Sequence, residues 1–325
     1  MTWRDVPVAI TGGMGFIGSN LALRLAALGA RVTVIDCMLN RYGANRHNLD
    51  GAGSAIRIIE ADMAAEEAVA PAVREAAVIF NLAGQTSHMD SMQEPLEDLR
   101  INQLANLSLL QLIQRSNPQA RVIFSSTRQF YGTPRYLPVD EAHPIAAPDI
   151  NGIHKYAAEA YHLLFARVYG LRTTALRLTN VFGPRMRIRD AKQGFLGIWL
   201  RHAIENTRFE VWGGEQKRDF TYVEDLVDAL LLSAEQDATI GKAYNIGGCP
   251  PVSLRDLAEM LVQAAGQGGF DIREFPAERK KIDIGDYVAD DTAFRAATGW
   301  QPKTTLAGGL ADTLAFYRTH AAHYL

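Results

Sequence analysis

The stretch "AITGGMGFIGSNLALRL", residues 9–25, decides how the rest of the chain is interpreted. An apolar run leads into glycines at three-residue spacing, Gly12, Gly15 and Gly18, and an amphipathic helical pattern follows them. Such a strand–loop–helix unit is typical of dinucleotide-binding proteins. The glycines allow a tight turn and bring backbone N–H groups close to a pyrophosphate, which the helix N-terminus stabilises. The alternative is a glycine-rich turn that holds no ligand.

Strand and helix patterns alternate along the chain. Short, almost continuously apolar runs predict buried strands at 6–11, 31–36, 55–60, 77–83, 121–126, 172–179 and 242–248. Longer patterns predict helices at 16–28, 64–75, 95–115, 151–169, 195–206 and 223–234. Strands that are buried on both faces and alternate with helices are typical of parallel sheets. We therefore predict an α/β fold with a Rossmann-type, doubly wound parallel sheet.

The pattern changes after residue 179. Residues 180–194, "NVFGPRMRIRDAKQG", are rich in Gly, Pro and Arg and are expected to form a loop. The last third of the chain mixes helices with short strands. We expect two domains, which are a dinucleotide-binding domain from 1–179 plus about 223–247 and a smaller substrate-binding domain from 180–222 plus 248–325.

The composition excludes several classes of partner. The 325 residues include 33 basic and 36 acidic side chains, so the net charge of −3 does not favour nucleic acid or an anionic membrane surface. No apolar stretch approaches the length of a transmembrane helix. The two cysteines, Cys37 and Cys249, lack metal-ligand spacing, and no metal site is expected. We expect a cytoplasmic protein.

Two aspartates follow predicted strands and indicate the cofactor. Asp36 ends the second strand, 18 residues after Gly18, where a carboxylate can accept hydrogen bonds from both ribose hydroxyls of an adenosine. It would repel the 2′-phosphate of NADP, so NAD is the predicted cofactor. Asp62 follows the third strand and could contact the adenine amine. Turn capping is the alternative role for both residues.

Five further motifs follow the glycine loop along the chain. They are "NLAGQ" (81–85), "SSTRQFYG" (125–132), "LRLTNVFGPR" (176–185), "RDFTYVEDLVDA" (218–229) and "YNIGG" (244–248). With the glycine loop, they resemble the extended short-chain dehydrogenases/reductases, specifically the NAD-dependent nucleotide-sugar epimerases and dehydratases. The resemblance covers nearly the whole chain.

The resemblance implies roles for individual residues. Thr127 would hydrogen-bond the sugar oxygen that changes oxidation state, and Lys155 would hold the nicotinamide ribose. The implied cofactor contacts are Gly12, Gly15, Phe16, Ile17, Gly18, Asp36, Asp62, Met63, Leu82, Ala83 and Lys155. The implied substrate contacts are Gln85, His88, Ser91, Asn180, Arg185, Arg218 and Arg279, with Arg218 on the nucleotide diphosphate. The family also pairs helices equivalent to 95–115 and 151–169, which implies a homodimer.

The first departure from the family lies at "NGIHK", residues 151–155. The family has Tyr-x-x-x-Lys, in which the tyrosine is the general acid and base, and Asn151 occupies the tyrosine position. An amide does not titrate in the required range. His154 shares the same broad helix face and can titrate near neutral pH, so it is a candidate to move the proton, with Asn151 as a hydrogen-bonding group. His88 is a second candidate.

The second departure follows Thr127. Dehydratases of the family have Asp-Glu there, whereas this chain has Arg128 and Gln129, so water elimination by the usual route is not expected. A nucleotide-sugar epimerase similar to UDP-glucose 4-epimerase is the leading prediction. The alternatives are a relative that binds NAD and nucleotide sugar without turnover, and a dehydratase or reductase with a different base. UDP, dTDP, CDP and GDP sugars all stay open.

Overall fold

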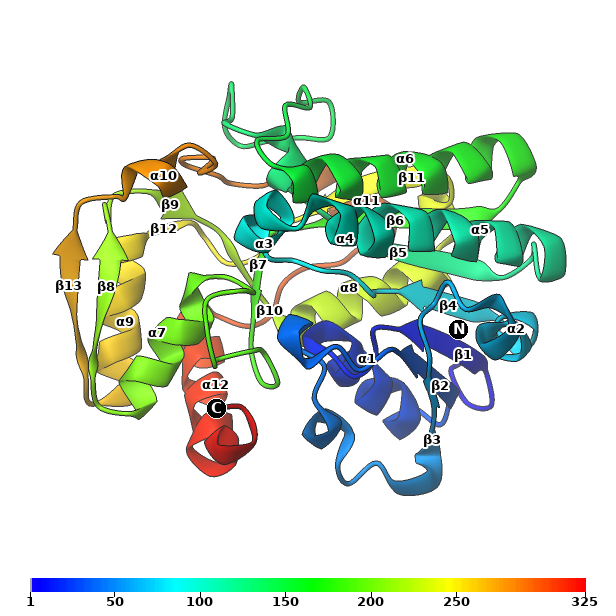
Figure 1. Cartoon of the computed structure of the whole chain (residues 1–325), viewed down its shortest axis with the longest axis horizontal. Coiled ribbons are helices and arrows are strands. Elements are labelled where there is room, and N and C mark those ends of the chain that lie inside the picture. Colours follow the sequence, from blue (N-terminus) through cyan, green and yellow to red (C-terminus); the bar gives the residue numbers. More distant parts are fainter. Residues whose placement is uncertain (1) are drawn as a thin grey trace.

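A seven-stranded parallel sheet forms the centre of the molecule (Figure 1). The computed structural model describes residues 2–325, apart from the side chains of Glu278 and Arg279. The strands are β1 (Pro7–Thr11), β2 (Arg31–Asp36), β3 (Ile56–Glu60), β4 (Val78–Asn81), β5 (Arg121–Thr127), β6 (Arg172–Leu178) and β11 (Lys242–Ile246). Their order is β3-β2-β1-β4-β5-β6-β11. The predicted Rossmann-type sheet is confirmed.

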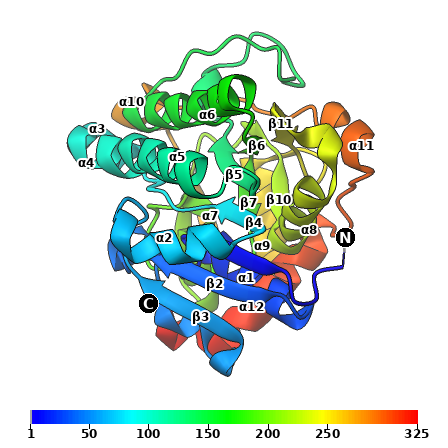
Figure 2. The ribbon, with the colours of Figure 1, turned by 90° about the vertical axis from the view of Figure 1, so that its right-hand side faces the viewer.

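Helices cover both faces of this sheet (Figure 2). One face carries α1 (Phe16–Ala27), α8 (Val223–Glu235) and α11 (Thr292–Thr298). The other carries α2 (Glu66–Glu75), α5 (Ala105–Ser116) and α6 (Ile150–Tyr169). Because the inner strands are covered on both sides, their central residues are mainly apolar, as in β1, β4 and β5, which explains why the sequence shows continuous runs instead of alternation. No helix in the described part of the chain is long and apolar enough to cross a membrane.

The helix predicted at 95–115 is interrupted. It consists of α4 (Pro95–Leu99), a π-helical turn at Arg100–Leu104, and α5. The turn contains the buried Asn102, whose side chain faces the loop after β4. A short helix that the sequence pattern did not predict, α3 (His88–Gln93), precedes this segment and is capped by Ser87, whose Oγ accepts from the Asp90 N–H at 3.1 Å.

Segments after residue 179 form a second lobe with a core of its own, to the left of the sheet in Figure 1. Its elements are β7 (Asn180–Phe182), α7 (Phe195–Ile204), β8 (Arg208–Trp212), β9 (Lys217–Arg218), β10 (Phe220–Tyr222), β12 (Val252–Ser253), α9 (Leu254–Ala265), β13 (Gly269–Arg273), α10 (Ala277–Lys280) and α12 (Leu306–His320). Between them, the chain returns to the sheet through α8 and β11.

Candidate active site

The site lies where the strand order of the sheet reverses, at the carboxyl ends of β1 and β4. A cavity of about 340 Å³ opens there, between the sheet and the loop that leads into the second lobe. All the residues that the sequence suggests as cofactor contacts line it, namely Gly12, Gly15, Phe16, Ile17, Gly18, Asp36, Asp62, Met63, Leu82, Ala83 and Lys155. The cavity therefore extends from the glycine loop to the helix that carries Lys155.

The glycine loop brings bare backbone to the cavity. Gly12 has a φ of +70°, a conformation that favours glycine. A Cβ on Gly18 would lie 2.7 Å from the Gly13 Cα, so only glycine lets α1 approach the loop this closely. Gly15 is the N-cap of α1 and has no side-chain cap, which leaves the first N–H groups of the helix available to an anion. These features suit the pyrophosphate of NAD.

Asp36 shapes the ribose end of the cavity. Its Oδ2 accepts the Met14 N–H at 3.0 Å, and its Oδ1 accepts the Met38 N–H at 2.9 Å. Burial raises the pKa of this carboxyl, and the two backbone hydrogen bonds oppose the rise. Each oxygen keeps a lone pair for a ribose hydroxyl, and a 2′-phosphate would meet a like charge. Asp62 lines the cavity and also caps its own turn by accepting the Ala64 N–H at 3.0 Å.

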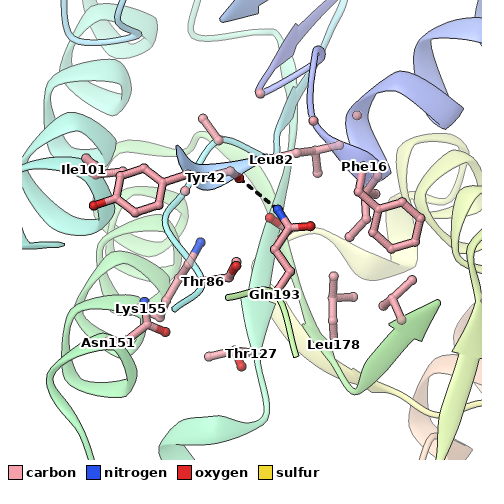
Figure 3. A pocket seen from close by; sticks show the side chains of 18 of the residues that line it. Phe16, Tyr42, Leu82, Thr86, Ile101, Thr127, Asn151, Lys155, Leu178 and Gln193 are labelled. Carbon is pink, nitrogen blue, oxygen red and sulfur yellow. Dashed lines mark hydrogen bonds between the residues drawn. The ribbon is translucent and has the colours of Figure 1, made fainter. Parts of the chain in front are cut away.

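Thr127, Asn151 and Lys155 meet at the other end of the cavity (Figure 3). Thr127 ends β5, and its Oγ1 accepts the Gln129 N–H at 3.1 Å, so its hydroxyl proton is free for a ligand. The Lys155 amine makes no hydrogen bond or ion pair with the described residues and lies 5.4 Å from the centre of the Phe124 ring. Burial lowers the pKa of Lys155 to about 8, although the charge of Asp98 opposes the shift.

Asn151, which the family resemblance predicts at the tyrosine position, is held by hydrogen bonds. Its Nδ2 donates to the Gln85 carbonyl at 2.8 Å and to Asp98 Oδ2 at 3.1 Å, and its backbone N–H donates to Ser91 Oγ at 3.2 Å. Both amide hydrogens are therefore used inside the protein. The Oδ1 atom accepts no hydrogen bond from the described residues and belongs to a side chain that lines the cavity, so it is available to a ligand or water.

His154 lies behind Asn151, on the side away from the cavity. It is not among the residues that line the cavity, and its Nδ1 lies 2.7 Å from Asp98 Oδ1. The carboxylate of Asp98 is buried and also accepts from Asn102 Nδ2 at 3.1 Å, so it joins the π-helical turn to α6. Direct proton transfer, the role suggested by the sequence, requires His154 to reach the cavity. The geometry instead favours a positioning role through Asp98.

Comparison with known proteins defines the family. Residues 8–247 match the model of the NAD dependent epimerase/dehydratase family. The chain belongs to that family. The UDP-glucose 4-epimerase of Mycolicibacterium smegmatis is 30% identical over 311 residues, which are 95% of this chain and 97% of that protein. The predicted NAD-dependent enzyme of the nucleotide-sugar epimerase and dehydratase class is confirmed.

Two solved structures share the fold over almost the whole chain. The UDP-glucose 4-epimerase of Thermotoga maritima, solved with UDP-glucose, has a TM-score of 0.87 at 29% identity and covers 97% of this chain and 99% of its own. MoeE5, solved with UDP-glucuronic acid and NAD, has a TM-score of 0.84 at 27% identity and covers 96% of this chain and 99% of its own. Both are structures of proteins with bound nucleotide sugar.

The substrate contacts suggested by the family resemblance lie in different places relative to the cavity. His88 and Asn180 line the cavity. Gln85 and Ser91 lie behind it and hold Asn151. The Arg218 side chain is buried outside the cavity lining, 3.1 Å from Asp283 Oδ1. The side chain of Arg279 lies outside the described residues.

The Arg185 side chain is held by contacts within the protein. Its Nη1 donates to Asn20 Oδ1 at 2.8 Å, its Nε donates to the Asn48 carbonyl at 3.3 Å, and its guanidinium lies 5.3 Å from the centre of the Phe316 ring. It does not line the cavity. In this family member Arg185 joins α1 to the second lobe, and the substrate contact expected from the sequence is not supported by its position.

Some residues of the site carried no signal in the sequence. Gln193 closes one side of the cavity, because its Nε2 donates to the Tyr42 carbonyl at 2.8 Å and joins two loops (Figure 3). Asp98 holds Asn151 and His154 although it lies more than 50 residues before them in the chain. Arg128 lines the cavity directly after Thr127. Of these three residues, only Arg128 had a signal in the sequence, namely its departure from the dehydratase pattern.

Proposed function

We propose that the protein is an NAD-dependent nucleotide-sugar epimerase similar to UDP-glucose 4-epimerase. The observation that carries this proposal is the meeting of Thr127, Asn151 and Lys155 at one end of a cavity whose other end has a dinucleotide loop. Arg128 and Gln129 stand where water elimination would need carboxyl groups, which favours epimerisation over dehydration. The epimerase relatives support this choice.

Each side chain of the site has its own role in the proposed reaction. NAD, when bound, accepts a hydride from the sugar and returns it. Thr127 donates a hydrogen bond from its free hydroxyl to the sugar oxygen and fixes the position of that oxygen. We assign the proton transfer to Lys155, whose neutral amine accepts the sugar hydroxyl proton at Nζ and later returns it. Asn151 orients the sugar or an ordered water through Oδ1, and His154 holds Asp98 in place.

Conversion of nucleotide sugars by the purified protein tests the proposed function. Incubation with NAD and a panel of UDP, dTDP, CDP and GDP sugars should give an epimer of at least one sugar. Because the hydride is returned, absorbance of reduced nicotinamide should not accumulate in proportion to product. Tight binding of NAD and nucleotide sugar with no product from any sugar would favour the binding protein without turnover, and release of water would favour a dehydratase.

The organisation of the chain fits this function. We propose that 1–179 with about 223–247 form the NAD-binding domain and that 180–222 with 248–325 form the nucleotide-sugar-binding domain. The separate apolar cores of the two lobes support this division, although α11, within 248–325, packs on the sheet with Phe294 in the core of the first lobe. We also propose a cytoplasmic location, which the two free cysteines, Cys37 and Cys249, support.

A homodimer through α6 and its neighbour is the proposed assembly. The exposed face of α6 carries Ile153, Leu164 and Val168 at helical spacing, and Leu104 is 50% exposed on the adjacent segment. Phe165 on the same helix is buried against the sheet and does not contribute to this face.

Light scattering tests the assembly. The protein should have the mass of a dimer at micromolar concentration, and a Leu164→Glu/Val168→Glu variant should be a monomer because two charges would be buried in the interface. Ile272→Glu, on β13 of the second lobe, changes an apolar side chain of similar exposure and should leave the dimer intact. A monomeric unmodified protein, or dissociation caused equally by the control, would contradict the proposed face.

A further inference from the structure

The guanidinium of Arg128 is an unpaired cation beside the reacting end of the cavity. Its Nη2 donates to Asn180 Oδ1 at 2.8 Å, and its Cζ lies 5.0 Å from the centre of the Tyr287 ring. Its Nη1 is buried and has no hydrogen-bond partner among the described residues. The side chain itself lines the cavity. Arg128 is thus held in place on two sides while part of its hydrogen-bonding capacity stays unused.

The charge of Arg128 has no direct counter-ion among the described side chains. Asp219 is the acid that most strongly favours the charged form of Arg128, yet no carboxylate oxygen of the described residues lies within ion-pair distance of the guanidinium. Asp219 Oδ2 accepts the Ala289 N–H at 2.9 Å, and burial raises the pKa of the Asp219 carboxyl to about 6. Asp283 is paired with Arg218.

Burial without a paired anion affects the protonation equilibrium of Arg128. It lowers the pKa of the guanidinium from its ordinary value. A desolvated cation without a partner is unfavourable, and an anionic group on a ligand would relieve that cost. An empty counter-ion position beside a substrate cavity therefore points to a negatively charged substrate.

The position of Arg128 in the chain indicates which part of a substrate it meets. It follows Thr127, the residue proposed to hold the reacting sugar oxygen. Its guanidinium donates a hydrogen bond to Asn180, which also lines the cavity. A group that contacts Arg128 therefore lies close to the reacting carbon, on the sugar ring. The planar fork of a guanidinium suits two parallel hydrogen bonds to a carboxylate.

We propose that Arg128 binds a carboxylate on the sugar ring, so that the substrate is a nucleotide-linked hexuronic acid. This inference rests on the proposed function and adds the class of sugar to it. MoeE5, whose fold is shared over almost the whole chain, has been solved with UDP-glucuronic acid, which shows that this fold can accommodate such a sugar. The other anionic source is the nucleotide diphosphate, which every nucleotide sugar carries.

Calorimetric titration of the NAD-loaded protein separates these two sources. The ligands are UDP, UDP-glucose and UDP-glucuronic acid, with and without the change Arg128→Met. The unmodified protein should bind UDP-glucuronic acid about 10 to 100 times more tightly than UDP-glucose, the scale of a charged bidentate contact. Arg128→Met should remove this preference and leave the affinity for UDP and UDP-glucose nearly unchanged.

A control variant and three contrary results decide whether the inference holds. Arg128→Lys keeps the charge but loses the planar fork, so it should retain part of the preference. An equal loss of affinity for UDP and UDP-glucuronic acid in Arg128→Met would assign Arg128 to the diphosphate and overturn the inference. Epimerisation of UDP-glucose without any preference for the uronic acid would overturn it as well and leave the proposed function standing. Failure to bind all three ligands would overturn the inference, and the proposed function would then depend on product from a dTDP, CDP or GDP sugar.

Discussion

Replacing Lys155 with methionine should lower kcat by about two to four orders of magnitude, the usual contribution of a general base. Lys155 has an amine in the cavity that makes no hydrogen bond or ion pair with the described residues, whereas His154 lies outside the cavity lining. Methionine keeps much of the side-chain volume and removes the titrating group. Lys155→Arg keeps the positive charge for the nicotinamide ribose but cannot accept a proton near neutral pH.

The measurements are kcat with the converted sugar and the affinity for NAD. Retained NAD binding by Lys155→Arg, together with lost turnover, would show that the proton and not the positive charge is required. Near-normal turnover by Lys155→Arg would remove Lys155 from proton transfer.

The pH dependence distinguishes Lys155 from His154. Only the neutral amine accepts a proton, so with a pKa of about 8 for Lys155, kcat should fall as the pH drops below 8, by about tenfold per unit. His154→Ala should keep this dependence and lower kcat by less than about tenfold, because His154 acts through Asp98. Loss of the pH dependence in His154→Ala, with a fall of 100-fold or more, would assign the proton transfer to His154.

Replacing Glu159 with leucine should cause the largest loss of stability. Glu159 is buried beneath the sheet, where its Oε1 lies 2.6 Å from Arg177 Nη2 and its Oε2 accepts the Ser126 hydroxyl at 2.6 Å. Its removal would leave the buried Arg177 charge without its carboxylate. We expect the free energy of unfolding to fall by about 3–5 kcal/mol, the scale for breaking a buried ion pair.

Urea denaturation followed by circular dichroism measures this change. Glu66→Leu is the matched control, because Glu66 forms an exposed ion pair with Arg115 at 2.8 Å, and solvent screens such pairs. The midpoint should move strongly for Glu159→Leu and little for Glu66→Leu. Equal and small shifts would show that the buried pair contributes nothing beyond its packing.

Local signals in the sequence were sufficient for the fold and for the cofactor end of the site. The glycine loop and Asp36 act through backbone geometry within a single βαβ unit, so their spacing along the chain already determines their spacing in space. The continuous apolar runs predicted the parallel sheet for the same reason, since each strand is buried by its own flanking helices.

The reacting end depended on contacts between distant segments. The family resemblance predicts Asn151 at the place of the family tyrosine, and helix periodicity predicts His154 on the same broad face. Only the tertiary structure showed that Asp98, from another helix, holds both side chains and that His154 lies outside the cavity lining, while Lys155 reaches into it. Periodicity gives the direction of a side chain from its own helix, but burial and hydrogen bonding depend on which other segment packs against that face.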